Sequence, residues 1–254
     1  MKVTLLGTGT SGGVPMIGCS CAVCTSKDPK DHRLRTSALI ETAQGKRILI
    51  DCGPDFRQQM LRAEIGDIDA VLFTHEHKDH TGGIDDLRAI NFIQKKSVPI
   101  YAEQNVLDAL RRQYDYVFAP NPYPGIPRID LQEITDEPFS LFGIEILPIR
   151  VMHGNLPVLG FRIGDFTYVT DASFIGEAQK VKIIGTKALV VNALRLKEHV
   201  SHFNLNEALD LLSELKPDSA YLTHVSHQMG RYETISSQLP ETVQLGYDGL
   251  NIYL

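Results

Sequence analysis

The chain is poor in the features that mark membrane, nucleic-acid-binding and secreted proteins. Its 254 residues contain no apolar run long enough to span a bilayer. The net charge is −6, with both signs spread along the sequence and no basic block, a balance that does not favour a nucleic acid as partner. The segment from Met1 to Gly7 reads as a strand and a glycine turn, not as a secretory leader. We therefore expect a cytoplasmic protein that does not engage a membrane.

Cysteine is also scarce, and its four copies are unevenly placed. Cys19, Cys21 and Cys24 form a C-x-C-x2-C triplet, whereas Cys52 stands alone and is expected to be a small buried residue. A cytosolic triplet of this kind more often binds metal than forms disulfides. Tetrahedral zinc needs a fourth ligand, which must come from a distant part of the chain. We expect a zinc-binding loop at about residues 12–33; the alternative is three reduced or buried thiols.

Three of the nine histidines, by contrast, fall within six residues. A short apolar strand at 70–73 is followed by T-H-E-H-K-D-H at 74–80 and then by a predicted helix. Because side chains alternate in extended backbone, His75 and His77 point to one side and can share a metal. Asp79 and His80 fall where the chain turns toward the helix and can face a second metal. This composition suits zinc, manganese or iron; the alternative is a solvated polar loop.

The remaining pattern predicts a layered α/β architecture. Strands and helices alternate up to residue 114, and the chain becomes β-rich from residue 129. The proline-rich stretch 119–127 reads equally well as a lid over a substrate pocket and as a stiff surface connection. No linker divides the chain, so we expect one domain spanning residues 1–254. The predicted helices are 55–65, 85–92, 105–114 and 204–215, and the predicted strands are 2–6, 36–41, 46–51, 70–73, 98–101, 130–134, 139–141, 144–151, 159–163, 166–170, 188–192 and 220–223, with two short strands near Val243 and Asn251.

Further candidate ligands follow the later strands. His153, Asp171 and His224 each come just after a predicted strand. His202 precedes a helix that Asn204 and Glu207 would open as a capping box, while the neighbouring His199 is expected to face solvent. Since these residues cluster at the ends of elements, we expect one convergent site.

These motifs together resemble the metallo-β-lactamase superfamily. The resemblance rests on H-x-H-x-D-H at 75–80, an aspartate closing a strand at Asp51, T-D-A at 170–172 and the late His224. It implies an αβ/βα sandwich of two mixed sheets flanked by helices, with two catalytic metals between the sheets. It also implies that Asp51 orients the metal loop by hydrogen bonding. The implied ligands are His75, His77 and His153 for the first metal, Asp79, His80 and His224 for the second, and Asp171 bridging both.

Two further features narrow the resemblance to one branch. The cysteine triplet, with S-H-F-N-L-N at 201–206 and T-H-V-S-H-Q at 223–228, is similar to the PhnP phosphodiesterases of the carbon–phosphorus lyase pathway and, more distantly, to ribonuclease Z. This implies a structural zinc on Cys19, Cys21, Cys24 and His227. It also implies that His202 is the general acid, with Asp79 and Asp51 supporting catalysis.

The resemblance implies hydrolysis of small, including cyclic, phosphodiesters by a metal-bridging hydroxide. The expected cofactors are two catalytic divalent metals (manganese, zinc or iron) and one structural zinc. Homodimers are common in the resembled family, but no stretch of this sequence shows an interface. Three alternatives stay open at this point: ribonuclease Z-like processing of transfer-RNA 3′ ends, thioester or lactone hydrolysis, and a catalytically silent metal-binding scaffold.

Overall fold

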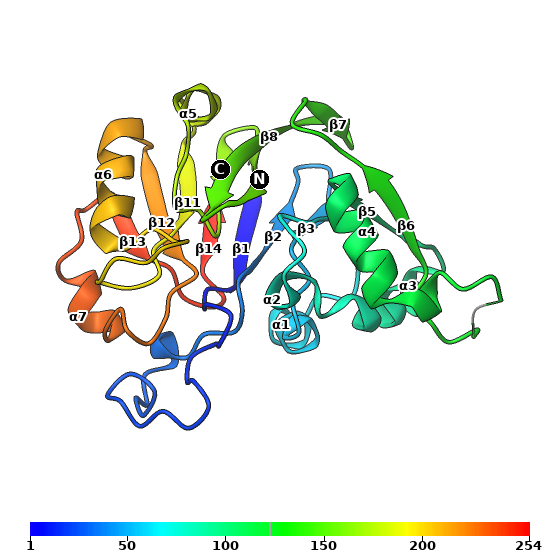
Figure 1. Ribbon diagram of the computed structural model, residues 1–254, viewed down its shortest axis with the longest axis horizontal. Helices are drawn as coiled ribbons and strands as arrows, with labels where there is room; N and C mark the ends of the chain where they lie inside the picture. The colour runs from blue at the N-terminus through cyan, green and yellow to red at the C-terminus, as the bar shows by residue number, and fades with distance from the viewer. Residues whose placement is uncertain (122) are drawn as a thin grey trace.

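The computed structural model describes residues 1–121 and 123–254. Two seven-stranded sheets pack face to face, and helices cover their outer surfaces (Figure 1). The first sheet has the order β14-β1-β2-β3-β4-β5-β6 and the second the order β13-β12-β11-β10-β9-β8-β7. The predicted αβ/βα sandwich of two mixed sheets is therefore confirmed.

The first sheet contains β1 (Lys2–Gly7), β2 (Ser37–Glu41), β3 (Arg47–Ile50), β4 (Ala70–Leu72), β5 (Val98–Ala102), β6 (Ile129–Glu133) and β14 (Asn251–Tyr253). The second contains β7 (Phe139–Leu141), β8 (Ile144–His153), β9 (Leu156–Ile163), β10 (Phe166–Tyr168), β11 (Ala188–Asn192), β12 (Ser219–Thr223) and β13 (Val243–Leu245). The helices are α1 (Phe56–Ala63), α2 (Lys78–Thr81), α3 (Leu87–Gln94), α4 (Gln104–Gln113), α5 (Glu177–Ile183), α6 (Leu205–Leu215) and α7 (Tyr232–Ser236).

Three hydrophobic cores hold the four layers together. Side chains from the facing surfaces of both sheets, including Ile48, Phe161 and Tyr168, form the central core. A second core lies between the first sheet and helices α1, α3 and α4, and a third lies between the second sheet and α6. Because buried strands of the sandwich are covered on both faces, they read in the sequence as continuous apolar runs, such as residues 48–50 of β3.

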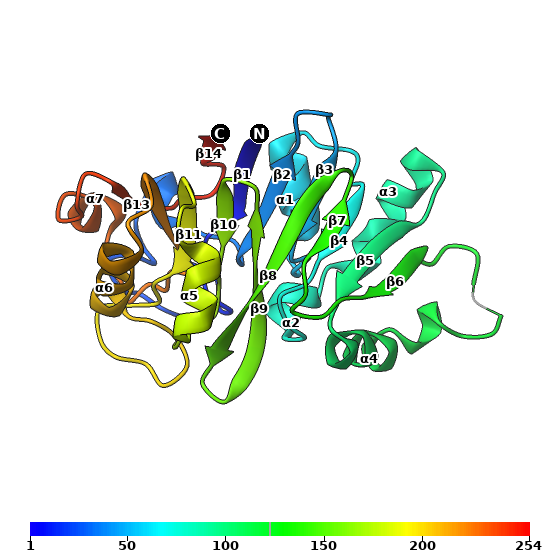
Figure 2. The same ribbon diagram turned by 90° about the horizontal axis from the view of Figure 1, so that it is seen from above.

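The sheet topology brings the candidate ligands to one edge. Strands β3 to β6 are mutually parallel, as are β10 to β13. Since parallel strands place their carboxyl ends along the same edge, the loops after β3, β4, β10 and β12 converge between the sheets. Figure 2 shows the two sheets and their helices from above.

Most predicted elements are present, with differences at their ends. Asp79 and His80 lie within the short helix α2, not in the turn before it. The predicted helix 85–92 is divided into a 3-10 turn at Ile84–Asp86 and the helix α3. The capping box of Asn204 and Glu207 is confirmed.

The described part of the proline-rich stretch packs on α3. Pro124, Gly125 and Ile126 line a pocket together with Arg88 and Phe92; Pro122 lies outside the described residues. Within the described residues, no helix combines the length and apolar character needed to cross a bilayer.

Candidate metal centres

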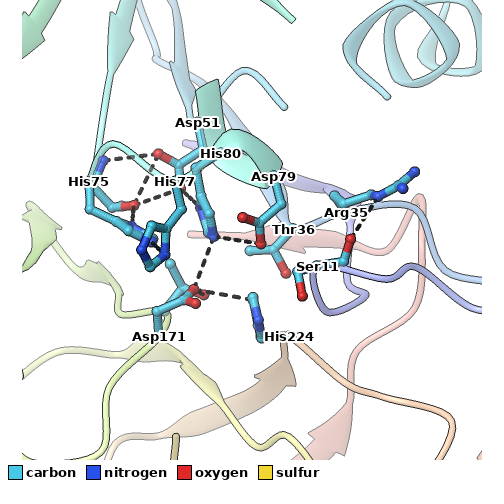
Figure 3. Close-up of polar contacts among 12 residues, drawn as sticks. Ser11, Arg35, Thr36, Asp51, His75, His77, Asp79, His80, Asp171 and His224 are labelled. Carbon is cyan, nitrogen blue, oxygen red and sulfur yellow. Dashed lines mark hydrogen bonds and ion pairs between the residues drawn. The ribbon is translucent and has the colours of Figure 1, made fainter. Parts of the chain in front are cut away.

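Three candidate residues at strand ends share an unusual backbone conformation. Asp51, Asp171 and His224 have φ values of 61°, 58° and 55°, in the left-handed region. A non-glycine residue costs about 1–3 kcal/mol there, so such conformations gather at sites where the surrounding structure enforces them. Figure 3 shows Asp51 and Asp171 beside His80, and His224 beside Asp171. The fold therefore holds strained backbone at these three positions, and this strain accompanies the convergence of their side chains.

The first ligand cluster consists of His75, His77 and His153, whose candidate ligand atoms lie within 4.8 Å of one another. His75 Nε2 is 3.0 Å from His77 Nδ1, and His75 Nδ1 is 3.0 Å from the Thr74 hydroxyl. His153 Nδ1 is 2.8 Å from the carbonyl oxygen of Ser201, to which only a protonated Nδ1 can donate. The free Nε2 of His153 is thereby left for a metal.

The second cluster consists of Asp79, His80 and His224, again within 4.8 Å, with Asp171 beside it. Asp171 Oδ2 lies 3.2 Å from His80 Nε2 and 3.1 Å from His224 Nδ1 (Figure 3). Both nitrogens are buried, yet among the described residues neither has a partner in hydrogen-bond geometry. Nitrogens that converge on a carboxylate without bonding to it are what a shared cation requires. The donor set therefore fits a pair of metals with Asp171 between them.

Asp51 supports this cluster from behind. Its Oδ2 accepts a hydrogen bond of 2.7 Å from His80 Nδ1, and its Oδ1 accepts one of 2.9 Å from the Thr74 amide. The carboxylate is completely buried. This contact directs His80 Nε2 toward the metals, as the outer partners of ligating histidines commonly do.

The charges in the second cluster favour the binding of a cation. Burial would raise the pKa of Asp171, but His224 and His80 hold it well below its usual value. Burial lowers the pKa of His224 to about 4, so this imidazole is neutral near pH 7. Burial also acts to lower the pKa of His80, but Asp171 and Asp51 raise it well above its usual value. His80 must therefore release a proton when it becomes a ligand.

His202 stands at the rim of the clusters. It is 9% exposed, and its Nε2 lies 3.0 Å from Asp171 Oδ1. Its position near His153 and Asp171 also puts it within ligand reach of those two residues. His199, which was expected to face solvent, is half-buried, and its Nδ1 lies 3.2 Å from His202 Nδ1. The loop between β11 and α6 folds back and joins the two rings.

The cysteine cluster is separate from the other two. Sγ of Cys19 and Sγ of Cys21 each lie 3.3 Å from His227 Nδ1, and Cys24 completes a group within 4.8 Å. The Cys24 amide, followed by His227, lowers the pKa of the Cys21 thiol to about 6, whereas burial raises the pKa of Cys24 to about 11. Three thiols and one imidazole fit a tetrahedral structural zinc. Cys52 lies elsewhere, completely buried in the core beneath α1.

The sequence did not indicate several residues that position the ligands. Asn192, at the end of β11, accepts a hydrogen bond from the Ala172 amide at 2.7 Å and donates one to the Ala172 carbonyl at 2.8 Å. It thereby fixes the backbone just after Asp171, while the Thr170 hydroxyl donates to Asp171 Oδ2 at 2.7 Å. Thr74 and Ser201 act similarly on the first cluster. In the sequence these positioning residues are marked only as polar residues at the end of an apolar strand or beside a histidine.

Comparison with protein families identifies the family to which the chain belongs. A family model described as "Beta-lactamase superfamily domain" matches residues 46–225. The chain belongs to the β-lactamase superfamily. This range contains Asp51 and all the candidate catalytic ligands, and the fold implies that they hold divalent metals.

Solved structures agree with this membership. The chain is 39% identical, with a TM-score of 0.93, to a structure described as a new diphosphatase from the PhnP family, covering 100% of this chain and 97% of that one. Human tRNase Z, short form, matches with a TM-score of 0.71 at 20% identity over 100% and 99% of the two chains, a likeness of fold alone. The resemblance to PhnP and, more distantly, to ribonuclease Z is thus confirmed, and it indicates a hydrolase.

A curated relative carries a different description. A Porphyromonas gingivalis protein described as "Octanoyltransferase" is 47% identical over 252 residues, which cover 98% of this chain and 51% of that protein. The chain spans about half the length of the curated relatives it matches.

Proposed function

We propose that this chain is a metal-dependent phosphodiesterase that hydrolyses small, including cyclic, phosphodiesters. The observation that carries this proposal is the position of His202, with Nε2 3.0 Å from Asp171 Oδ1. The oxygen that leaves a phosphodiester is an alkoxide, which departs faster when a proton reaches it as the bond breaks. An imidazolium at the rim of the metal clusters is suited to deliver that proton.

The ligand clusters supply the other half of the chemistry. When bound, two divalent cations would lower the pKa of a water molecule and neutralise charge on the phosphate oxygens; manganese, zinc and iron all suit this donor set. The chain holds the ligands in place through Asp51 on His80 and the Ser201 carbonyl on His153. A small substrate agrees with the net charge of −6, which would oppose the approach of a long polyanion such as transfer RNA.

Diphosphates are the nearest alternative within the same chemistry, because the similar PhnP-family structure is described as a diphosphatase. The leaving group is then a phosphate, a weaker base than an alkoxide, and needs less help from an acid. A histidine held as His202 is therefore better matched to a diester than to a diphosphate.

Acyl thioester hydrolysis is the second candidate function. It is favoured by the description of the 47% identical relative as an octanoyltransferase, although this chain spans about half of that protein. A thiolate leaves readily without a proton, so this reaction would depend little on His202.

One set of assays separates the three reactions. Metal-loaded protein is given a cyclic ribonucleotide diester, a nucleoside diphosphate and an octanoyl thioester, with His202→Ala tested beside Val200→Ala. Val200 is 90% exposed on the same loop and serves as the matched control. We expect turnover of the diester, reduced about 10²- to 10⁴-fold by His202→Ala and unchanged by Val200→Ala. Turnover of the thioester or diphosphate alone, insensitive to His202→Ala, would reject the diesterase.

A further inference from the structure

The second cluster takes two of its ligands from a helix that is too short to be stable by itself. Helix α2 contains four residues, and Asp79 and His80 are two of them. Forming a single helical turn costs more conformational entropy than its one or two hydrogen bonds return, so an isolated helix of this length does not persist in water. The positions of these two ligands therefore depend on the contacts that hold α2 from outside.

The carbonyl groups at the end of α2 show where these contacts are. The last carbonyls of a helix have no partner within the helix and must find one elsewhere. The carbonyl of His80 accepts a hydrogen bond from the Cys52 amide at 2.8 Å. The carbonyl of Thr81, the last residue of α2, accepts one from the Tyr114 hydroxyl at 2.9 Å. The end of α2 is thus held from two sides.

The two contacts come from different parts of the fold. Cys52 directly follows Asp51, which also bonds to the His80 ring, so this contact belongs to the support already described. Tyr114 lies 33 residues away from Thr81 and is the C-cap of α4. It is 7% exposed and packs in the core between the first sheet and its helices. Because the ring is enclosed, its hydroxyl is held in one place.

The same end of α4 makes a second contact with α2. Oε1 of Gln113, the last residue of α4, lies 3.4 Å from the Thr81 hydroxyl. That hydroxyl is completely buried with its residue and donates to the His77 carbonyl at 3.1 Å. His77 directly precedes α2 and is a candidate ligand of the first cluster. The end of α4 therefore meets α2 at more than one point, and Tyr114 makes the shorter bond.

We propose that Tyr114 is a positioning residue for the second cluster: its hydroxyl fixes the end of α2 and thereby the positions of Asp79 and His80. Removing a partner that holds a metal ligand from behind commonly weakens metal binding about 10- to 100-fold. Tyr114 acts through the backbone of α2, so we expect an effect at the lower end of this range. The inference concerns metal binding and rests on the proposed function only for its effect on turnover.

The test removes one hydroxyl and follows each metal separately. Tyr114→Phe is compared with the unchanged protein and with Tyr116→Phe, a matched control whose hydroxyl bonds to Asp85, outside α2, at 2.5 Å. The metal-free proteins are titrated with cobalt(II) against a chelator. In Tyr114→Phe we expect one catalytic site to bind about tenfold more weakly. Asp79→Asn should weaken the same step of the titration, which identifies the site as the second cluster.

Hydrogen exchange gives a measurement that needs neither metal nor substrate. In the metal-free protein, the amides of His80 and Thr81, which donate to the His77 carbonyl at 3.0 Å, should exchange faster in Tyr114→Phe and at the original rate in Tyr116→Phe. Diesterase activity that Tyr114→Phe loses at limiting metal should return at saturating metal, because the substitution acts on metal affinity.

Three results would overturn the proposal. One is an unchanged cobalt titration in Tyr114→Phe, and another is an equal loss in both substitutions. The third is an equal loss at both catalytic clusters and the cysteine cluster, which would make Tyr114 a general support of the fold. If no phosphodiester is turned over at all, the proposed function fails, whereas the titration still decides whether Tyr114 positions the second cluster.

Discussion

The aspartate–histidine clusters and the cysteine cluster share one loop, which carries His224 of the first group and His227 of the second. The two groups differ in how their ligands are held. The catalytic ligands come from the ends of several strands and helices, and hydrogen bonds to Asp51, Thr74 and Ser201 orient them. The three cysteines come from one loop with a small core of its own around Val14 and Val23. The first site is thus built by the fold, whereas the second must largely be built by its metal.

Removing Asp171, the carboxylate proposed to bridge two metals, should have the largest effect on catalysis. Asp171→Ala leaves His80 and His224 without the charge between them, so we expect loss of metal from both catalytic clusters and a fall in kcat/KM of more than about 10³-fold. Metal analysis and diesterase assays measure both. Zinc on the cysteine cluster should stay bound. Its loss in the same variant would show that the two sites are not independent.

Removing a thiol from the cysteine cluster should have the opposite effect, with loss of zinc from that cluster. Cys21→Ser should release the structural zinc and lower the free energy of unfolding by several kcal/mol. Hydrogen exchange should accelerate at residues 12–33 and around His227, while the strands of both sheets stay protected. If exchange in this loop is unchanged without zinc, the loop does not need its metal.

Weakening the orienting contact should give an intermediate effect. Asp51→Asn preserves the size of the side chain but removes the charge that accepts from His80 Nδ1, so we expect catalytic metal affinity about 10- to 100-fold weaker. Competition with a chelator measures this change. Zinc binding by the cysteine cluster provides the internal control, because Asp51 does not contact it.

The metal-free protein should show a pH dependence that metal removes. The folded-state pKa of His80 is raised by Asp171 and Asp51 despite burial, so its contribution to stability is fully present below the unfolded pKa of about 6.5. That contribution is lost as the pH rises toward the folded pKa, at up to about 1.4 kcal/mol per pH unit. Denaturation of apo protein between pH 6 and 9 should show this decline. The decline should be absent in apo His80→Asn and in the metal-loaded protein.

The smallest effect is expected at the cysteine outside the cluster. Cys52 is completely buried and packs in the core beneath α1. Cys52→Ala should cost about 1 kcal/mol by removing a buried sulfur and should leave zinc content unchanged. A reduced zinc content would mean that Cys52 takes part in metal binding after all.

Local patterns in the sequence predicted most of the fold. Apolar runs located the strands, and a capping box located α6. The short helices α5 and α7 were not predicted, because each buries a single residue, Ile183 and Ile235, and so has no apolar period to detect. The assignment of β13 and β14 to different sheets depends on long-range pairing that three-residue strands do not encode.

For the site, the sequence indicated the ligand types but not what holds them. The sequence does not show that Asp51, Asp171 and His224 adopt left-handed backbone, because only a few per cent of non-glycine residues do so, even though Asp and His are enriched among them. The contact of His199 with His202 depends on how one loop folds back, which residue spacing does not determine. The metal roles, the cytoplasmic location and any homodimer stay predictions.

The two ends of the chain lie together (Figure 1), on the edge of the sandwich away from the candidate metal ligands. The backbone amide of Leu254 donates to the carbonyl of Met1. Strand β1 runs in the same direction as β3, so it begins at the edge opposite the one where β3 ends in Asp51. Either end can therefore carry a tether or a second folded unit without blocking the site, and a short peptide joining the ends would permit circular permutation at a loop elsewhere.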